Sequence, residues 1–333
     1  MQNSSPRSAL VLGMLTALAA WTRPASAQEQ VKGFAVDRLY LSAPGGGWFV
    51  MDTLDMHGGL GGAASLTAGY AHNPLRVRTA DGAQRLTVVS DEALATFGVA
   101  ATYDRFRLYL DLDMPLDVDG QGGVVGGYRF SPPNSGQRFT PSGVTPGTAP
   151  DTFSDARIGF DVRLLGSCQA RFRLGAGAQA LVPSPNTDRS SYLTDGSYHA
   201  MARVLFAGDI GLFTYAGHLG VHIRPLDDSP APGSPEGSEL LFGAAGGARI
   251  AAWGRTVLVM GPEVFGATAV RSVFGAGTTA LEGLLTGRLE GTGDRGPQLR
   301  FKLGLGGGIH PRFGAPEERL VVAVELFDHD ARE

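Results

Sequence analysis

The chain has 333 residues, of which 43% are hydrophobic and 18% are charged, so it can fold and is not a disordered protein. Its formal net charge of -4 gives no basic footprint for nucleic acid, which we exclude as a partner. The 49 glycines, roughly twice the average usage, favour β structure with crowded or sharply curved strands.

Residues 1–27 predict a secretory signal peptide. Arg7 supplies the positive charge, residues 9–21 form the apolar run, and Ala25-Ser26-Ala27 is the small-residue cleavage site. The apolar run is shorter than the roughly 20 residues of a spanning helix, and no cysteine follows it for lipid attachment. We therefore expect export from the cytoplasm, with a mature chain that begins at Gln28.

Residues 28–59 predict an ordered lead-in without a strand of membrane length. Short alternating pieces surround Phe34 and Trp48. The lead-in is expected either as a periplasmic strap or as a segment inside the lumen of a barrel. The first convincing strand follows at residues 61–72, and a polar connection through Asp81-Gly82 leads to the next strand.

The stretch 93–116 predicts a β-hairpin. Apolar residues occupy alternate positions at 95–103 and again at 106–114, on both sides of Asp104-Arg105. The second arm has a wholly apolar face and a face that carries charge. Two such apolar faces meet in the core of a soluble sandwich, whereas in a transmembrane barrel they meet lipid. Each arm is about ten residues long, which suits a tilted strand that crosses a bilayer.

The same pattern continues to residue 327, with long and short connections in alternation. The long connections at 115–153, 183–196 and 225–237 are rich in polar residues, glycine or proline. Further strands are predicted at 157–164, 171–180, 197–206, 211–224, 239–252, 256–266, 279–290, 298–310 and 319–327. Pro262 makes 256–266 the least secure of them. The sequence thus predicts an all-β fold, an antiparallel transmembrane β-barrel of about 12 strands over residues 60–328, with a tail at 329–333.

The polar residues that alternate with apolar ones on these strands are the predicted lining of the lumen. They are Arg107, Asp111, Asp113, Arg157, Asp161, Arg163, Arg171, Arg173, His218, His222, Arg300 and Lys302. We expect the charges to pair across a largely closed lumen, because unpaired buried charges are costly. The alternative is a narrow aqueous path whose excess of cationic groups favours anions.

Residue patterns for catalysis or metal binding are weak throughout the chain. Asp111, Asp113, Asp117 and Asp119 resemble the start of a calcium loop, but no glutamate follows at the required position. The histidines lack zinc spacing, and the Ser190-Ser191 pair near His199 is a coincidence of a loop rather than a catalytic set. Cys168 is the single cysteine, which excludes an internal disulfide. We predict a non-catalytic protein without metal or cofactor.

Four segments resemble a known family, the outer-membrane β-barrels found at the N-terminus of OmpA-family proteins in myxobacteria and their relatives. The segments are GFAVDR at 33–38, WFVMDTLDMHG at 48–58, DVRLLG at 161–166 and GDIGLFTYA at 208–216. The resemblance implies a barrel in the outer membrane and no catalytic residue. Many such proteins look as though they continue into a peptidoglycan-binding domain, but this chain stops soon after Phe327, so peptidoglycan contact is not supported.

The leading function is therefore an outer-membrane β-barrel that contacts lipid and serves as a structural membrane element or a narrow pore for small solutes or ions. The alternative is a secreted, soluble all-β binding protein whose apolar faces pack together. With the short turns in the periplasm, both mature termini are expected there and the long loops are expected to face outward.

Overall fold

The computed structural model describes residues 29–56, 58–133, 139–140, 143–144, 154–168, 170–184, 189–226, 237–291, 296–310 and 314–329. The predicted signal peptide, most of the C-terminal tail and parts of the long loops lie outside these ranges. Within them, no helix has the length and apolarity needed to cross a membrane.

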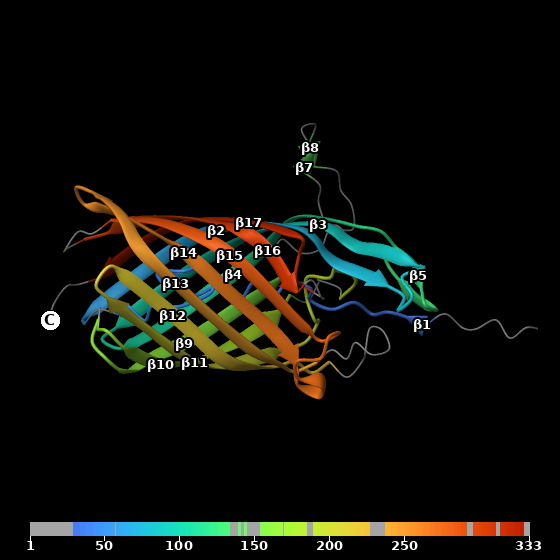
Figure 1. Ribbon diagram of the computed structural model, residues 1–333, viewed down its shortest axis with the longest axis horizontal. Helices are drawn as coiled ribbons and strands as arrows, with labels where there is room; N and C mark the ends of the chain where they lie inside the picture. The colour runs from blue at the N-terminus through green and yellow to red at the C-terminus, as the bar shows by residue number, and fades with distance from the viewer. Residues whose placement is uncertain are drawn as a thin grey trace, which may run out of the picture.

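Across the described residues, twelve strands form one closed antiparallel barrel (Figure 1). They are β2 (Leu60–Arg78), β3 (Arg85–Tyr103), β4 (Phe106–Asp119), β9 (Asp155–Leu165), β10 (Arg173–Pro183), β11 (His199–Ile210), β12 (Phe213–Ile223), β13 (Glu239–Trp253), β14 (Thr256–Ala269), β15 (Thr279–Gly291), β16 (Gln298–His310) and β17 (Glu318–His329). Each strand pairs with the next one in sequence, and β17 pairs with β2 to close the wall. The predicted fold class is confirmed.

Strand β14 forms despite Pro262. The ladder with β15 runs through the proline, which lies opposite Leu285. On the other side, the ladder with β13 is interrupted between the pairs Ala245–Glu263 and Ala248–Met260. The proline, which has no N–H to donate, falls within this interruption, where its effect on pairing is smallest.

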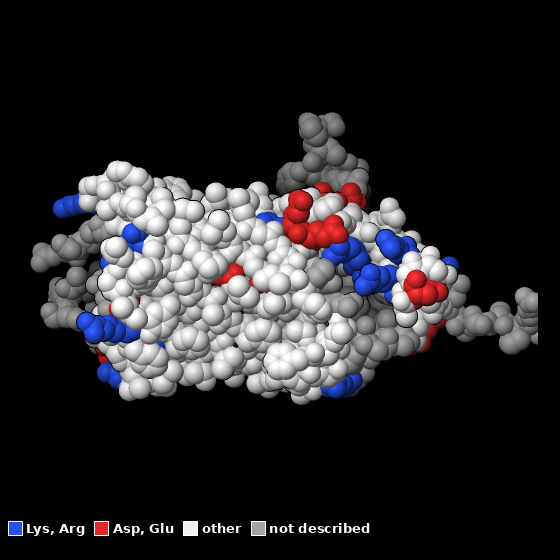
Figure 2. All heavy atoms as spheres, viewed as in Figure 1, with Lys and Arg blue, Asp and Glu red and all other residues white. Residues whose placement is uncertain are grey.

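The wall buries its charged face and exposes its apolar face. In β9, Arg157 and Asp161 are buried while Ile158 and Phe160 are exposed, and β16 and β17 alternate in the same way. Figure 2 shows the outcome: most of the barrel's flank is free of charged side chains, which gather toward the two ends. The barrel is thus inside out compared with a soluble sandwich, whose apolar faces meet in a core.

The two ends of the barrel differ in their connections. At the end that we call the turn end, tight turns such as Asp104-Arg105, Gly211-Leu212 and Gly254-Arg255 join the strands. Asp104, Gly211 and Gly254 have φ between 52° and 63° there. Two-residue hairpin loops need such positive φ values to match the right-handed twist of the strands. At the opposite end, which we call the loop end, the longer connections leave the barrel after β4, β10, β12, β14 and β16.

The loop end carries ordered structure beyond the barrel wall. Strands β2 and β3 remain paired as far as Arg78 and Arg85, and a small sheet lies beside them (Figure 1). That sheet contains β1 (Glu29–Gln30), β5 (Gly123–Val125) and β6 (Tyr128–Phe130). The remaining short elements are β7 (Phe139–Thr140), β8 (Gly143–Val144), η1 (Arg189–Ser191) and η2 (Val270–Ser272).

The polar connection between the first two strands is shorter than predicted, because β2 continues past His72 to Arg78 and β3 begins at Arg85. A buried apolar cluster supports the projecting β2–β3 ribbon, with Leu75, Val77 and Val88 packed against Phe34 and Phe130. The ribbon leaves the wall through a bulge after His72, where Asn73 adopts a φ of 55°. Apolar burial outside the barrel therefore extends both strands to 19 residues.

The lead-in threads the barrel from the loop end to the turn end. Glu29–Gln30 pairs with β6 at the loop end, and Gly59 accepts a hydrogen bond from the backbone N–H of Asp104 at the turn end. Residues 31–56, which we call the lumenal segment, cross the interior between these points. Fully extended, a segment of this length reaches roughly 85 Å, well beyond the roughly 36 Å of an eleven-residue strand. It can therefore cross the barrel with length to spare.

The expectation that both ends of the mature chain share one side is therefore wrong. The first described residues lie at the loop end, while β17 ends beside Gly61 at the turn end. Figure 1 shows β1 beyond the loop end of the barrel. The sequence alone leaves the lead-in free to start at either end, because it contains no strand that fixes its place in the wall.

Candidate functional site

The lumenal segment folds into a tight hairpin inside the turn-side half of the barrel. The N–H of Ser42 donates to the carbonyl of Phe49 at 2.7 Å, and Gly47 pairs with Asp52 in an isolated bridge. Trp48 and Met51 are fully buried in a cluster with residues from the wall. These wall residues are Ala207, Ala216, Ala245, Val259, Phe265, Leu284, Val321 and Ala323. The middle of the lumen is thus filled by apolar side chains of the chain itself.

Glu263 on β14 holds the tip of this hairpin. Its carboxylate is fully buried and accepts hydrogen bonds from three consecutive backbone N–H groups, those of Phe49 at 3.0 Å, Val50 at 2.9 Å and Met51 at 3.5 Å. The hydroxyl of Thr286 donates a further bond at 2.7 Å. Hydrogen bonds to a carboxylate are about twice as strong as neutral ones, so this group fixes the depth of the segment.

Two arginines near the turn end pair the segment with the wall. Arg107 on β4 lies between Asp52 of the segment and Asp161 of β9, and its bond to Asp161 is 2.7 Å long. Arg173 on β10 pairs with Asp55 of the segment at 2.5 Å and with Asp209 at 2.7 Å. Each guanidinium thus bridges one carboxylate of the segment and one of the wall.

A second set of charges lies against Trp48. Lys302 donates to the carbonyl of Trp48 at 3.1 Å and to Glu325 at 2.7 Å. Arg300 pairs with Glu325 at 2.9 Å and with Glu290 at 2.8 Å. These groups satisfy one another and the segment's backbone, so little of their charge remains available to a passing ion.

Toward the loop end, the segment is held by an ion-pair cluster with balanced charge. Arg38 of the segment and Arg224, which follows β12, both contact Glu239, at 2.9 Å and 2.8 Å. Arg224 also pairs with Asp195 at 2.6 Å, and Asp195 accepts the N–H of Ala35 at 2.8 Å. Burial alone would raise the pKa of Asp195, but the Arg224 charge and these hydrogen bonds lower it to about 2.

The histidines of the loop-side half form a chain of ring contacts. His222 lies between His199, at 2.6 Å, and the hydroxyl of Tyr40, at 3.3 Å. His199 approaches Asp155 at 3.4 Å through its other ring nitrogen. His218 is buried near Arg203 and the lumenal segment. All of these side chains fill the interior rather than a surface cleft.

The structure places most of the predicted lining residues on the inner face. The buried ones are Arg107, Asp111, Arg157, Asp161, Arg163, Arg173, His218, His222, Arg300 and Lys302. Asp113 also faces inward, half-buried, and accepts a bond from Thr96 at 2.6 Å. Arg157 pairs with Asp111 at 2.7 Å. In the residues that the structure describes, no group of three or more metal-ligating side chains comes together.

The assignment of Arg171 to the lumen is wrong. Strand β10 begins only at Arg173, so Arg171 belongs to the preceding turn, where alternation of faces no longer applies. Its side chain is exposed, and its carbonyl accepts the hydroxyl of Tyr215 at 2.8 Å.

Several residues at the centre of the site were missed by reasoning from strands alone. They are Asp37, Arg38, Asp52, Asp55, Glu239, Glu282 and Arg319, which connect the segment to the wall. One signal was present: Trp48, Phe49, Val50 and Met51 are four consecutive apolar residues, a run typical of a segment buried on all sides. Nothing in that run reveals which strands surround it.

The comparison with family models gives no match, and neither does the comparison with curated proteins. Among solved structures, the chain is similar to an outer membrane channel from Pseudomonas putida F1, with a TM-score of 0.47, 15% identity, and coverage of 82% of this chain and 95% of that one. It is also similar to the CymD monoaromatic hydrocarbon channel, with a TM-score of 0.38, 11% identity, and coverage of 84% and 91%. Values this low concern the general barrel shape and carry no inference about a solute.

Proposed function

We propose that this chain is an outer-membrane β-barrel whose lumen is filled by its own N-terminal segment. It serves as a structural membrane element and, when the segment moves, as a narrow pore for small solutes. The proposal includes no catalytic step. Its partners are outer-membrane lipid and small solutes or ions.

One observation carries the membrane assignment: the closed wall exposes its apolar face and buries its charged face. Leu108, Leu164 and Leu303 are exposed on the outside, while Arg107 and Asp161 are buried inside. In water, an exposed apolar belt of this extent would cost about 25 cal/mol for every Å², whereas in a bilayer it meets lipid. Because the barrel is closed, no strand edge of the described wall has unpaired backbone groups, which would be costly in the bilayer. The soluble alternative is disfavoured because it needs these faces in a core.

Aromatic side chains at strand ends support the same placement. Tyr103, Phe213 and Trp253 are exposed at the turn end, and Tyr198 is exposed near the loop end. Such residues favour the two interfaces of a bilayer, where an amphipathic ring contacts both headgroups and hydrocarbon. With the turn end in the periplasm, the loop end and the small sheet that contains β1 face the outer medium.

The filled lumen supports a closed resting state. The packed hairpin around Trp48 and the carboxylate of Glu263 occupy the middle of the path. A solute can pass only after the lumenal segment shifts. The predicted signal peptide at 1–27, the domain limits and the kinship with OmpA-family barrels are parts of this proposal, supported by the sequence patterns given above.

Two measurements test the proposal. The full chain should fractionate with outer membranes and migrate faster on SDS gels before boiling than after it, as folded barrels do. Recovery in the soluble fraction would contradict the membrane assignment.

In planar bilayers, the purified chain should be largely silent, and Glu263→Ala should show frequent openings because the hairpin loses its acceptor. The matched control is Glu318→Ala, which removes an exposed glutamate from the rim. Large, steady conductance of the unmodified chain would contradict a filled lumen. Silence of the Glu263→Ala variant would leave a purely structural barrel.

A further inference from the structure

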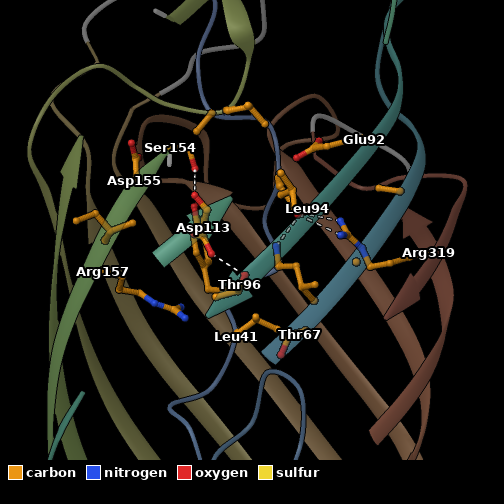
Figure 3. Close-up of a pocket in the computed structure, with 18 of the residues that line it drawn as sticks. Leu41, Thr67, Glu92, Leu94, Thr96, Asp113, Ser154, Asp155, Arg157 and Arg319 are labelled. Atoms are coloured by element: carbon orange, nitrogen blue, oxygen red, sulfur yellow. Dashed lines mark hydrogen bonds and ion pairs between the residues drawn. The ribbon is translucent and has the colours of Figure 1, made fainter. Parts of the chain in front are cut away.

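A cavity of about 90 Å³ remains inside the barrel near the loop end, beside residues 35–41 of the lumenal segment. Its wall comes from β2, β3, β4, β9, β10, β11 and β17. Figure 3 shows the carboxylates of Glu92 and Asp113 on opposite sides of this space, with Asp155 close to Asp113. A water-sized group needs about 15 Å³, so the cavity has room for about six such groups.

The charge around the cavity is not balanced. In the described part of the chain, four carboxyl groups and two guanidinium groups line it. The carboxyl groups are those of Asp37, Glu92, Asp113 and Asp155, and the guanidinium groups are those of Arg157 and Arg319. Both arginines already have partners: Arg157 pairs with Asp111 at 2.7 Å, and Arg319 pairs with Glu282 at 2.8 Å and Asp37 at 2.7 Å.

Two of the carboxylates have an oxygen that no described residue satisfies. Glu92 is 3% exposed, and its Oε1 has no hydrogen-bond partner among the described residues. Asp155 is 5% exposed, and the same holds for its Oδ1, while its Oδ2 lies 3.4 Å from His199. A buried carboxylate without a partner is costly. A cation that binds beside it supplies the missing hydrogen bond and the opposite charge, so it removes that cost.

The rest of the lining combines five leucines with the polar side chains of Tyr40, Thr67, Thr96, Ser154 and His199, and the leucines decide between kinds of cation. Leu39, Leu41, Leu94, Leu181 and Leu193 all border the cavity. A hydrated metal ion would make no favourable contact with these leucine side chains. In addition, the described carboxylates and histidines do not converge as metal ligands do. An ammonium group on a short hydrocarbon matches both parts, because its charge meets the carboxylates and its chain meets the leucines.

We propose that this cavity binds a small alkylammonium ion, with the ammonium group beside the unsatisfied oxygen of Glu92, the alkyl chain against the leucines, and the carboxylates of Asp113 and Asp155 across the cavity adding to the negative field. This binding site rests on the proposed function in one respect, namely that solutes reach the cavity from the loop end. It also reverses the anion preference considered from the sequence, because the two arginines that line the cavity pair with carboxylates, while Glu92 and Asp155 each keep an unsatisfied oxygen.

The test is calorimetric titration of the purified full chain in detergent with n-butylammonium chloride. We expect saturable binding, no saturable binding of the neutral isostere 1-butanol, and at least tenfold weaker binding to Glu92→Gln. The matched control Glu318→Gln changes an exposed glutamate and should bind as the unmodified chain does. Heat-modifiable migration checks that each variant is folded, and Asp155→Asn serves as a second variant with the same expected direction.

Three outcomes would overturn the inference: no saturable binding to the unmodified chain, equal binding of 1-butanol, or unchanged binding to folded Glu92→Gln and Asp155→Asn. Saturable binding of calcium chloride that excludes the alkylammonium ion would overturn it as well, in favour of a metal site. Because titration in detergent requires neither a membrane nor conduction, its failure is distinguishable from failure of the pore proposal, which fractionation and bilayer recordings decide.

Discussion

The two halves of the lumen are closed in different ways. In the turn-side half, the hairpin around Trp48 fills the space with apolar side chains, and Glu263 binds its backbone. In the loop-side half, ion pairs hold the segment, and a cavity with unsatisfied carboxylates remains. The lumen is thus filled by packed side chains in the turn-side half and keeps a space that a solute can occupy in the loop-side half.

Truncating the packed hairpin should have the largest effect. Trp48→Ala removes a fully buried ring that also lies 4.8 Å from the guanidinium of Arg288. We expect a loss of about 3 to 5 kcal/mol in unfolding free energy, as for other buried aromatic side chains. Urea unfolding of the reconstituted barrel measures it. Trp253→Ala, at an exposed site on the outer face, is the control and should cost far less.

Removing the bridge at the turn end should rank second. Arg107→Leu leaves Asp52 and Asp161 buried without their shared cation. Breaking a buried ion pair on one side costs about 3 kcal/mol or more. The same unfolding measurement should show that adding Asp52→Asn recovers part of this loss. If the two changes are simply additive, the segment is not coupled to the wall at this point.

Low pH should destabilise the loop-side half, where Asp195 pairs with Arg224. The folded pKa of Asp195 is lowered from 3.8 to about 2. Its stabilising pairing is therefore fully present above about pH 4 and is lost as the pH falls through about 2. The shift corresponds to about 2 kcal/mol of unfolding free energy. Unfolding curves between pH 5 and pH 2 should show this loss, and Asp195→Asn should be less stable at pH 5 and should lack this part of the acid response.

The smallest effect is expected at the cavity. Glu92→Gln replaces a buried carboxylate that has an unsatisfied oxygen by a neutral group of the same shape. The unfolding free energy should stay within about 1 kcal/mol of the unmodified chain, or rise, because a buried carboxyl group with an unsatisfied oxygen is removed. A clear destabilisation would mean that Glu92 is already satisfied within the protein, and the contrast between the two halves would disappear.

The sequence by itself determined the wall of this barrel. Alternation at 106–114 and 157–164 places every second residue on one face, which is a local property with a period of two. The twelve strands and the inward positions of Arg107, Asp161 and Lys302 follow from it. The same rule failed at Arg171, because alternation carries no information beyond the end of a strand.

Only the tertiary structure decided what fills the barrel. The run Trp48 to Met51 has no strand periodicity, and its position depends on an acceptor, Glu263, that lies more than 200 residues later in the chain. The end at which the chain enters, the partners of Asp52 and Asp55, and the unsatisfied oxygen of Glu92 depend on the same arrangement. Such contacts depend on distances in the folded barrel, and a pattern read along the sequence cannot supply those distances.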